Sequence, residues 1–362
     1  KKILQQLVSF PGIMHPTVER HTHFLLGKNT GLEDWTRAYH VVRSIGVSYT
    51  AQLSSVLNKD LRITSNQDLM EKVSQIPSDW GVVCISAGRG SFTSGLLLSR
   101  LSSDSSPFTV NVGACECTTQ EPFLSVVEEF TFIMRESSGT TSKNNTQSFN
   151  KQVWWSKRER LNEKLEKWLD RLQCYLGELS SLMLGKILNK EIDSMIKDAA
   201  KDFCLKKCEK CGQHWNTEVV YHILNAVATE EFTLDSVRNF LQRTNMYNNS
   251  IFRKIRNIRK ASSGKTIERA PVVLVLDGNL LHLPWESLKV LRGQQLTRLP
   301  SLAFLFPRLK QQTLFSSESF YILNPSKDLP HTQSTFERYF NQQRWQGLSE
   351  VPPTESEFSG AL

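Results

Sequence analysis

One short stretch of the sequence concentrates residues that could bind a metal ion. CLKKCEKCGQHW brings Cys204, Cys208, Cys211 and His214 close together along the chain. Three thiolates and an imidazole can hold Zn²⁺ tetrahedrally, and Gly212 would let the chain turn between them. The three cysteines are also spaced i, i+4 and i+7, as on one helix face, where buried cysteines are common. We favour packed thiols on a helix and keep zinc as the alternative.

The other cysteines and histidines do not form a recognisable catalytic pair. Cys115 and Cys117 follow a predicted strand, where an α/β hydrolase places its nucleophile, but a cysteine nucleophile needs a histidine that takes its proton. No His-Gly sequence marks a strand end in the chain, and His282, in an apolar stretch, is expected to be a packed core residue. We therefore assign no catalytic residue, no cofactor site and no metal ligand.

Two basic features could attract phosphate or acidic groups. Gly264-Lys265-Thr266 copies the end of a phosphate loop, but Arg259 stands where the first glycine belongs, and the segment precedes a strand instead of following one. Residues 253–269 hold seven lysines and arginines against Glu268. Such a stretch could attract acidic peptide or nucleic acid, although a solvated helix face is the simpler explanation, which we favour.

The composition is that of a globular protein. Of the 362 residues, 39% are hydrophobic and 22% charged, with a net charge of +8, which excludes bulk disorder and predicts two or three structural units. No apolar run is long enough to span a bilayer, and residues 1–4 lack the features of a signal peptide. Seven cysteines, an odd number, indicate reduced thiols in the cytosol or nucleus. The missing initiator Met predicts an internal fragment.

The sequence predicts a series of helices and strands that position these residues. Residues 1–76 are expected to be helical, because apolar residues keep a helical spacing from Trp35 to Leu57. Short apolar runs then predict strands in PSDWGVVCIS and PFTVNVG, with SGLLLSRL between them as a strand or short helix. Residues 77–120 would be the first strands of an α/β subdomain.

Helical spacing returns from residue 121 and predicts a helical insertion over residues 121–265. RESSGTTSKNNTQSFN should form a loop, and VWWSKRERLNEKLEKWLDRLQCYLGELSSLMLGKIL should form a coiled-coil-like helical hairpin. The α/β pattern resumes over residues 266–362, with strands in VVLVL and SFYILNP. Near the end, Thr354 and Glu357 have the spacing of a helix capping box.

The segment VVLVLDGNLLHLPWESL poses a question, because a core strand is followed at once by Pro284, Trp285 and Glu286. We expect Pro284 to fix a turn, Trp285 to be a buried anchor, and Glu286 to cap or accept hydrogen bonds from nearby backbone. These three residues are interpreted as scaffold, not as catalytic groups.

Five blocks of the sequence, taken in order, resemble separase, the caspase-like cysteine endopeptidase family. The blocks lie within residues 77–362, and the helical region before them resembles the family more loosely. They are PSDWGVVCIS, LLLSRL, VWWSKRERLNEKLEKWL, LPWESL with QLTRLPSLAFL, and FYILNPSKDLPHTQSTFERYF.

The resemblance implies an α/β caspase-like fold. Residues 77–362 would form the pseudo-protease half, with the helical insertion projecting from it, and the start of the protease subdomain, after an N-terminal α-helical region. The catalytic histidine and cysteine of the family lie beyond the block PTESEFSGAL, so neither position falls within these residues. Some separases cut themselves after an arginine in a flexible loop, so the resemblance makes Arg135, at the start of the predicted loop, a candidate for self-cleavage.

The resemblance further implies a role in chromosome segregation. The parent protein would cleave the kleisin subunit of cohesin at anaphase, be inhibited by securin, and occupy cytoplasm and nucleus, acting on mitotic chromosomes. No cofactor and no membrane contact are expected. The first alternative is a non-catalytic module that docks securin or other regulators. The second is a zinc-stabilised scaffold that binds nucleic acid.

Overall fold

The computed structural model forms two compact units, residues 1–306 and 307–362. The described residues are 15–29, 31–52, 63–88, 95–112, 123–140, 151–203, 206–207, 214–228, 232–244, 247–310, 319–354 and 356–357. The helices are α2 (Pro16–Lys28), α3 (Asp34–Gln52), α4 (Asn66–Val73), α5 (Phe123–Gly139), α6 (Lys151–Leu176), α7 (Lys190–Lys201), α8 (Thr217–Asn225), α9 (Leu234–Arg243), α10 (Asn249–Ser262), α11 (Leu305–Lys310) and α12 (Pro330–Gln343). The strands are β1 (Gly81–Ala87), β2 (Leu96–Ser102), β3 (Ser105–Val112), β4 (Lys206–Lys207), β5 (His214–Trp215), β6 (Val272–Leu276), β7 (Leu296–Leu299), β8 (Phe320–Leu323) and β9 (Gln346–Ser349).

A five-stranded mixed sheet organises the first unit. Its order is β3-β2-β1-β6-β7, with β1 antiparallel to β2 and parallel to β6. The two predicted α/β segments therefore meet in one sheet, although the helical insertion separates them along the chain. The segment SGLLLSRL, predicted as a strand or short helix, is strand β2, paired on both sides.

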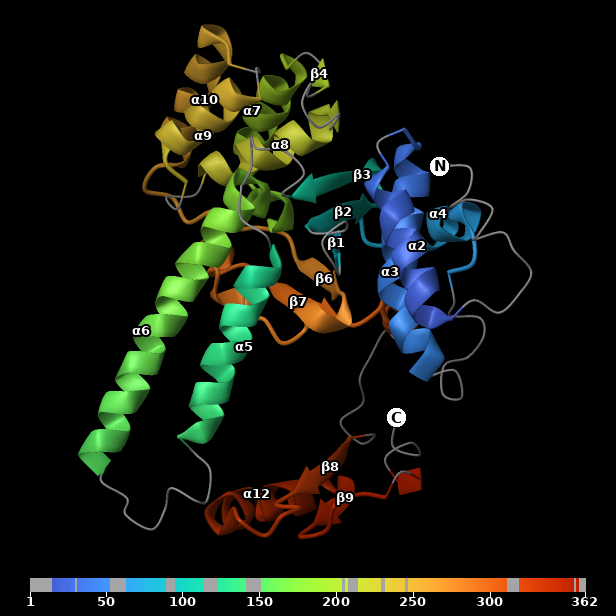
Figure 1. Cartoon of the computed structure of the whole chain (residues 1–362), viewed down its shortest axis with the longest axis vertical. Helices are drawn as coiled ribbons and strands as arrows, with labels where there is room; N and C mark the ends of the chain where they lie inside the picture. The colour runs from blue at the N-terminus through green and yellow to red at the C-terminus, as the bar shows by residue number, and fades with distance from the viewer. Residues whose placement is uncertain are drawn as a thin grey trace. The chain divides into compact units, whose positions relative to one another are not determined.

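Helices cover both faces of this sheet, and every residue of β1, β2 and β6 is buried. Val83 and Ile85 of β1 belong to the core shared with the insertion helices. Ser86 lies on the opposite face, where its hydroxyl shares a hydrogen bond with that of Ser44 of α3 at 2.8 Å. Figure 1 shows α2 and α3 beside β1 to β3, with α7 to α10 gathered on the other side. The first unit is therefore a three-layer α/β structure.

Helices α5 and α6 form a long antiparallel hairpin (Figure 1). At its base Trp168 is fully buried, donates to the Val126 carbonyl at 2.7 Å and packs on Phe130. The predicted hairpin within residues 153–188 is wrong in its pairing: α6 is one helix, and its partner is α5. The predicted loop also begins too early, because α5 continues to Gly139.

The segment after β6 carries the predicted anchor. Trp285 is fully buried and its indole nitrogen donates to the Leu280 carbonyl at 2.9 Å. Glu286 does not bind the backbone as expected; it pairs with Arg298 of β7 at 2.7 Å, and Arg298 in turn donates to the carbonyls of Leu281 and Leu283. A side chain thus fixes the turn to the neighbouring strand.

The second unit is a small β-α-β arrangement in which β8 and β9 pair in parallel beside α12. Phe340 of α12 packs between Tyr321 and Trp345. The predicted capping box is present, because the Thr354 hydroxyl accepts from the Glu357 amide at 3.3 Å, while the Glu357 carboxylate accepts from the Thr354 amide at 2.8 Å. The proposed four-part division of the chain stays a prediction.

Candidate functional site

The carboxyl ends of parallel strands are where open α/β sheets usually bind ligands. In the first unit, β1 ends at Ala87 and β6 runs into Asp277. Arg20 of α2 forms an ion pair with Asp277 and donates to the Ala87 carbonyl at 2.7 Å. The side chains of Arg20 and Asp277 are 4% and 1% exposed, so this pair is buried at the edge.

More titratable groups lie between α2 and α3. His23 and His40 contact each other through their Nδ1 atoms at 2.8 Å, and both are buried. Burial, followed by the charges of His40 and Arg43, lowers the pKa of His23 to about 3. Burial and then Arg43 lower the pKa of His40 to about 4. Both imidazoles are therefore neutral at physiological pH, while Glu19 neutralises Arg43 at 2.5 Å.

This cluster holds elements together rather than exposing a reactive group. Cys84 in β1 is fully buried, and burial raises the pKa of its thiol, so it stays protonated. The Ser44 hydroxyl donates to the Val41 carbonyl and shares a second hydrogen bond with the Ser86 hydroxyl, which ties it to structural groups. Among the described residues at this edge, the buried pair of Arg20 and Asp277 joins the helical layer to the sheet.

Sequence reasoning missed this pair because its members lie 257 positions apart. Asp277 offered one signal: an acidic residue directly after five buried apolar residues sits at a strand's carboxyl end. Nothing in the sequence around Arg20 pointed to it.

Most of the predicted zinc ligands lie outside the residues that the structure describes. Cys204, Cys208 and Cys211 are not among the described residues, and His214 belongs to β5, which pairs with β4 in antiparallel fashion. Because residues 206–207 form a strand, the predicted single helix through these cysteines is wrong. No group of three or more potential metal ligands occurs among the described residues.

Other sequence expectations also need correction. His282 is exposed, not a packed core residue, and its ring lies 5.6 Å from that of Phe130. Arg135 lies within α5 and not in a loop, so its backbone lacks the extended form a protease requires. Cys115 and Cys117 lie outside the described residues.

Part of the basic stretch forms an exposed helix face. Arg253, Arg256 and Lys260 of α10 are exposed, and their spacing places them on one side. No carboxylate within the described part of the chain forms an ion pair with any of the three. Lys254, in contrast, pairs with Asp198 at 2.9 Å.

No helix in the described part is long and apolar enough to cross a membrane.

Comparisons with known proteins agree on one family. The family model "Separin, protease domain" matches residues 91–362. Curated separins are 26% identical in Mus musculus, over 82% of this chain and 14% of that protein, and 24% identical in Schizosaccharomyces pombe, over 85% and 19%. The chain therefore spans less than a fifth of these relatives.

Solved structures show the same fold. A chain from the crystal structure of the Saccharomyces cerevisiae separase-securin complex at 3.0 Å resolution superimposes with a TM-score of 0.70 and 16% identity. The match covers all of this chain and 28% of that one. The resemblance carried by the five sequence blocks is confirmed. The family model matches three-quarters of the length of this chain, and the chain therefore belongs to the separin protease-domain family.

Proposed function

We propose that this chain is part of a separase, the cysteine endopeptidase that cleaves the kleisin subunit of cohesin, releases sister chromatids at anaphase and is inhibited by securin. The family match over residues 91–362 carries the proposal. The fold shared with a separase solved in complex with securin supports it.

In this proposal the first unit is the pseudo-protease half of a caspase-like fold. The buried pair of Arg20 and Asp277 at the carboxyl ends of β1 and β6 supports the assignment, because a catalytic half needs reactive groups that a substrate can reach at this edge. The nucleophilic cysteine and its histidine would come from elsewhere in the longer protein. The thiolate would attack the scissile carbonyl, the peptide C–N bond would break as the histidine protonates the leaving amine, and water would then hydrolyse the acyl-enzyme to a carboxylate and the free thiol.

The test of the protease role uses the full-length protein and purified cohesin kleisin. We expect kleisin cleavage that stops after thiol alkylation and continues in the presence of a zinc chelator. Cleavage that alkylation leaves intact would exclude a cysteine nucleophile, and failure to cleave with securin removed would overturn the proposal.

The second candidate is a docking module that binds securin without catalysis. The observation that favours it is that the matching solved chain comes from a separase-securin complex. The 362-residue chain, immobilised and exposed to purified securin, distinguishes the two roles. Securin capture together with an inactive full-length protein would support the docking module alone.

The proposed location of the protein is the cytoplasm and nucleus, with action on mitotic chromosomes. Direct contact with nucleic acid would use helix α10. Its three exposed cations would neutralise about three phosphates, so the logarithm of the DNA affinity should fall with the logarithm of salt at a slope of about −2.7. A flat salt dependence excludes this contact. Imaging of the tagged protein through mitosis tests the location.

A further inference from the structure

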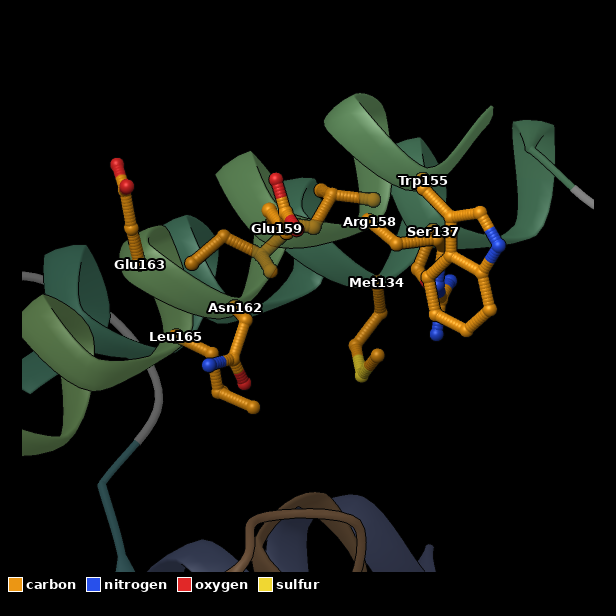
Figure 2. A pocket seen from close by; sticks show the side chains of 10 residues that line it. Met134, Ser137, Trp155, Arg158, Glu159, Asn162, Glu163 and Leu165 are labelled. Carbon is orange, nitrogen blue, oxygen red and sulfur yellow. The ribbon is translucent and has the colours of Figure 1, made fainter. Parts of the chain in front are cut away.

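A groove of about 600 Å³ runs along one side of the α5–α6 hairpin. Its lining from α5 includes Met134, and its lining from α6 includes Trp155 and Leu165. Figure 2 shows Met134 and Leu165 along one edge, with Glu159 and Glu163 pointing to the other. We call it the hairpin groove.

The hairpin groove is shaped before any partner arrives. At the tip, Trp154 donates from its indole nitrogen to the Thr140 carbonyl at 3.2 Å, which ties the start of α6 to the end of α5. Arg158 donates to the Ser137 hydroxyl at 2.8 Å and lies over the Trp154 ring. A partner therefore does not have to order these two helices when it binds.

Large apolar side chains are left exposed at this groove. Trp155 is 52% exposed and Met134 is 40% exposed, although both line a groove that also includes the apolar side chain of Leu165. Trp and Met at a groove between helices are typical anchors for an amphipathic helix, which buries its apolar face there.

The charge beside this apolar lining is negative. Glu159 and Glu163 are exposed, lie one turn apart on α6, and form no ion pair with a cation in the described part of the chain. Arg158 lines the same groove but is held over Trp154 and against Ser137. Two like charges at i and i+4 destabilise a helix slightly, so an incoming cation would relieve that cost.

Three cations of α6 line a second recess. Lys157, Arg160 and Lys164 line a separate recess, and Lys157 and Lys164 lie at least about 100° around the helix axis from both Glu159 and Glu163. The negative edge of the hairpin groove is thus local, even though the chain carries a net charge of +8. At physiological ionic strength, charges more than about 8 Å away are largely screened for an exposed ligand.

We propose that the hairpin groove binds an amphipathic helix of a partner protein whose apolar face is flanked by Lys or Arg residues four positions apart. The apolar face packs on Met134, Trp155 and Leu165, and completes a three-helix arrangement with α5 and α6. The paired cations meet Glu159 and Glu163, which lie about 6 Å apart along the α6 axis, as do residues i and i+4 of the incoming helix. This inference does not depend on the proposed protease role.

The test selects peptides of about 16 residues, long enough for four helical turns, from a random display library against the 362-residue chain. We expect enriched peptides to combine large apolar residues at helical spacing with Lys or Arg at i and i+4. Synthetic copies should lose affinity by about tenfold or more on Trp155→Ala, the size expected for a central aromatic anchor. They should also weaken on the double change Glu159→Lys, Glu163→Lys.

Lys157→Glu is the matched control, because it changes one exposed charge on the opposite face of α6. It should alter affinity by less than about threefold, and thermal melts should confirm that all variants are folded. The proposal is overturned if selection yields no peptide, if acidic peptides are enriched, or if the Trp155 and glutamate variants bind the selected peptides as well as the unchanged chain does.

Discussion

At the scale of single residues, the ion pair between Arg20 and Asp277 joins the N-terminal helices to the end of β6. Because both side chains are almost fully buried, loss of one partner leaves an uncompensated charge in a low-dielectric interior. We expect Asp277→Ala to destabilise the protein by about 3 to 5 kcal/mol in denaturant unfolding. The double change Arg20→Met, Asp277→Leu should cost less than Asp277→Ala, since no buried charge remains.

Lys72→Ala is the matched control for that pair. It removes a partly exposed i,i+4 contact with Asp68 at 2.9 Å and should cost less than about 1 kcal/mol. If Asp277→Ala costs no more than Lys72→Ala, the pair does not hold the helical layer to the sheet.

The two buried histidines make stability depend on pH. The unfolded imidazoles take up protons near pH 6.5, whereas in the folded state burial keeps the pKa values of His23 and His40 at about 3 and about 4. The unfolded state therefore binds more protons below pH 6.5, so stability is full above that pH and falls as the pH falls toward 4. Between pH 6.5 and 5 the loss should be roughly 3 kcal/mol for the two together.

Chemical denaturation at several pH values measures this loss, and the double variant His23→Phe, His40→Gln should flatten the curve over the same interval. A variant curve as steep as that of the unchanged protein would assign the acid sensitivity to other groups.

At the scale of elements, the α5–α6 hairpin is held by its base more than by its ion pairs. Trp168 is fully buried, while Lys164 and Glu136 are each about one-third exposed. Trp168→Ala should therefore cost about 3 to 5 kcal/mol and speed amide hydrogen exchange in α5. Lys164→Ala, the matched control, should cost less than about 1 kcal/mol. Equal effects of the two changes would contradict this reasoning.

Local patterns predicted elements better than they predicted partners. The apolar runs at Val82–Ile85 and Val272–Leu276 marked buried strands correctly, because a strand between two helical layers must be apolar on both faces. Helical spacing identified α6, but no local rule says which helix packs against it, so the hairpin was paired wrongly.

The candidate site was harder still to predict. Arg20 and Asp277 meet only because the fold brings distant segments together, and a lone arginine in a helix carries no sign of burial. The exposure of His282 was likewise mispredicted, since an apolar sequence context does not fix which side of a turn a residue faces. The five separase-like blocks identified the family. They did so because they occur in the same order along the chain, and not because of any single residue.

At the scale of the whole molecule, the first unit depends on a strand pairing that spans the helical insertion. β1 pairs along its length with β6, from Gly81 with Val272 to Ile85 with Leu276. Arg269, just before β6, also donates to the Asn225 carbonyl of the insertion at 3.0 Å. The segment that follows α10 therefore supplies a pairing partner for β1 and a hydrogen-bond donor for the insertion.

We therefore expect a fragment of residues 1–306 to unfold cooperatively, and a fragment of residues 1–264 to aggregate. In the shorter fragment β1 becomes an open, apolar edge strand, which is prone to pair with other chains, and Arg20 loses Asp277. Adding a peptide of residues 265–306 during refolding should restore solubility, because it supplies β6 and Asp277 in trans. Circular dichroism and light scattering decide the outcome: a soluble 1–264 fragment with a cooperative melt would mean that the helical insertion and the first strands form a core of their own.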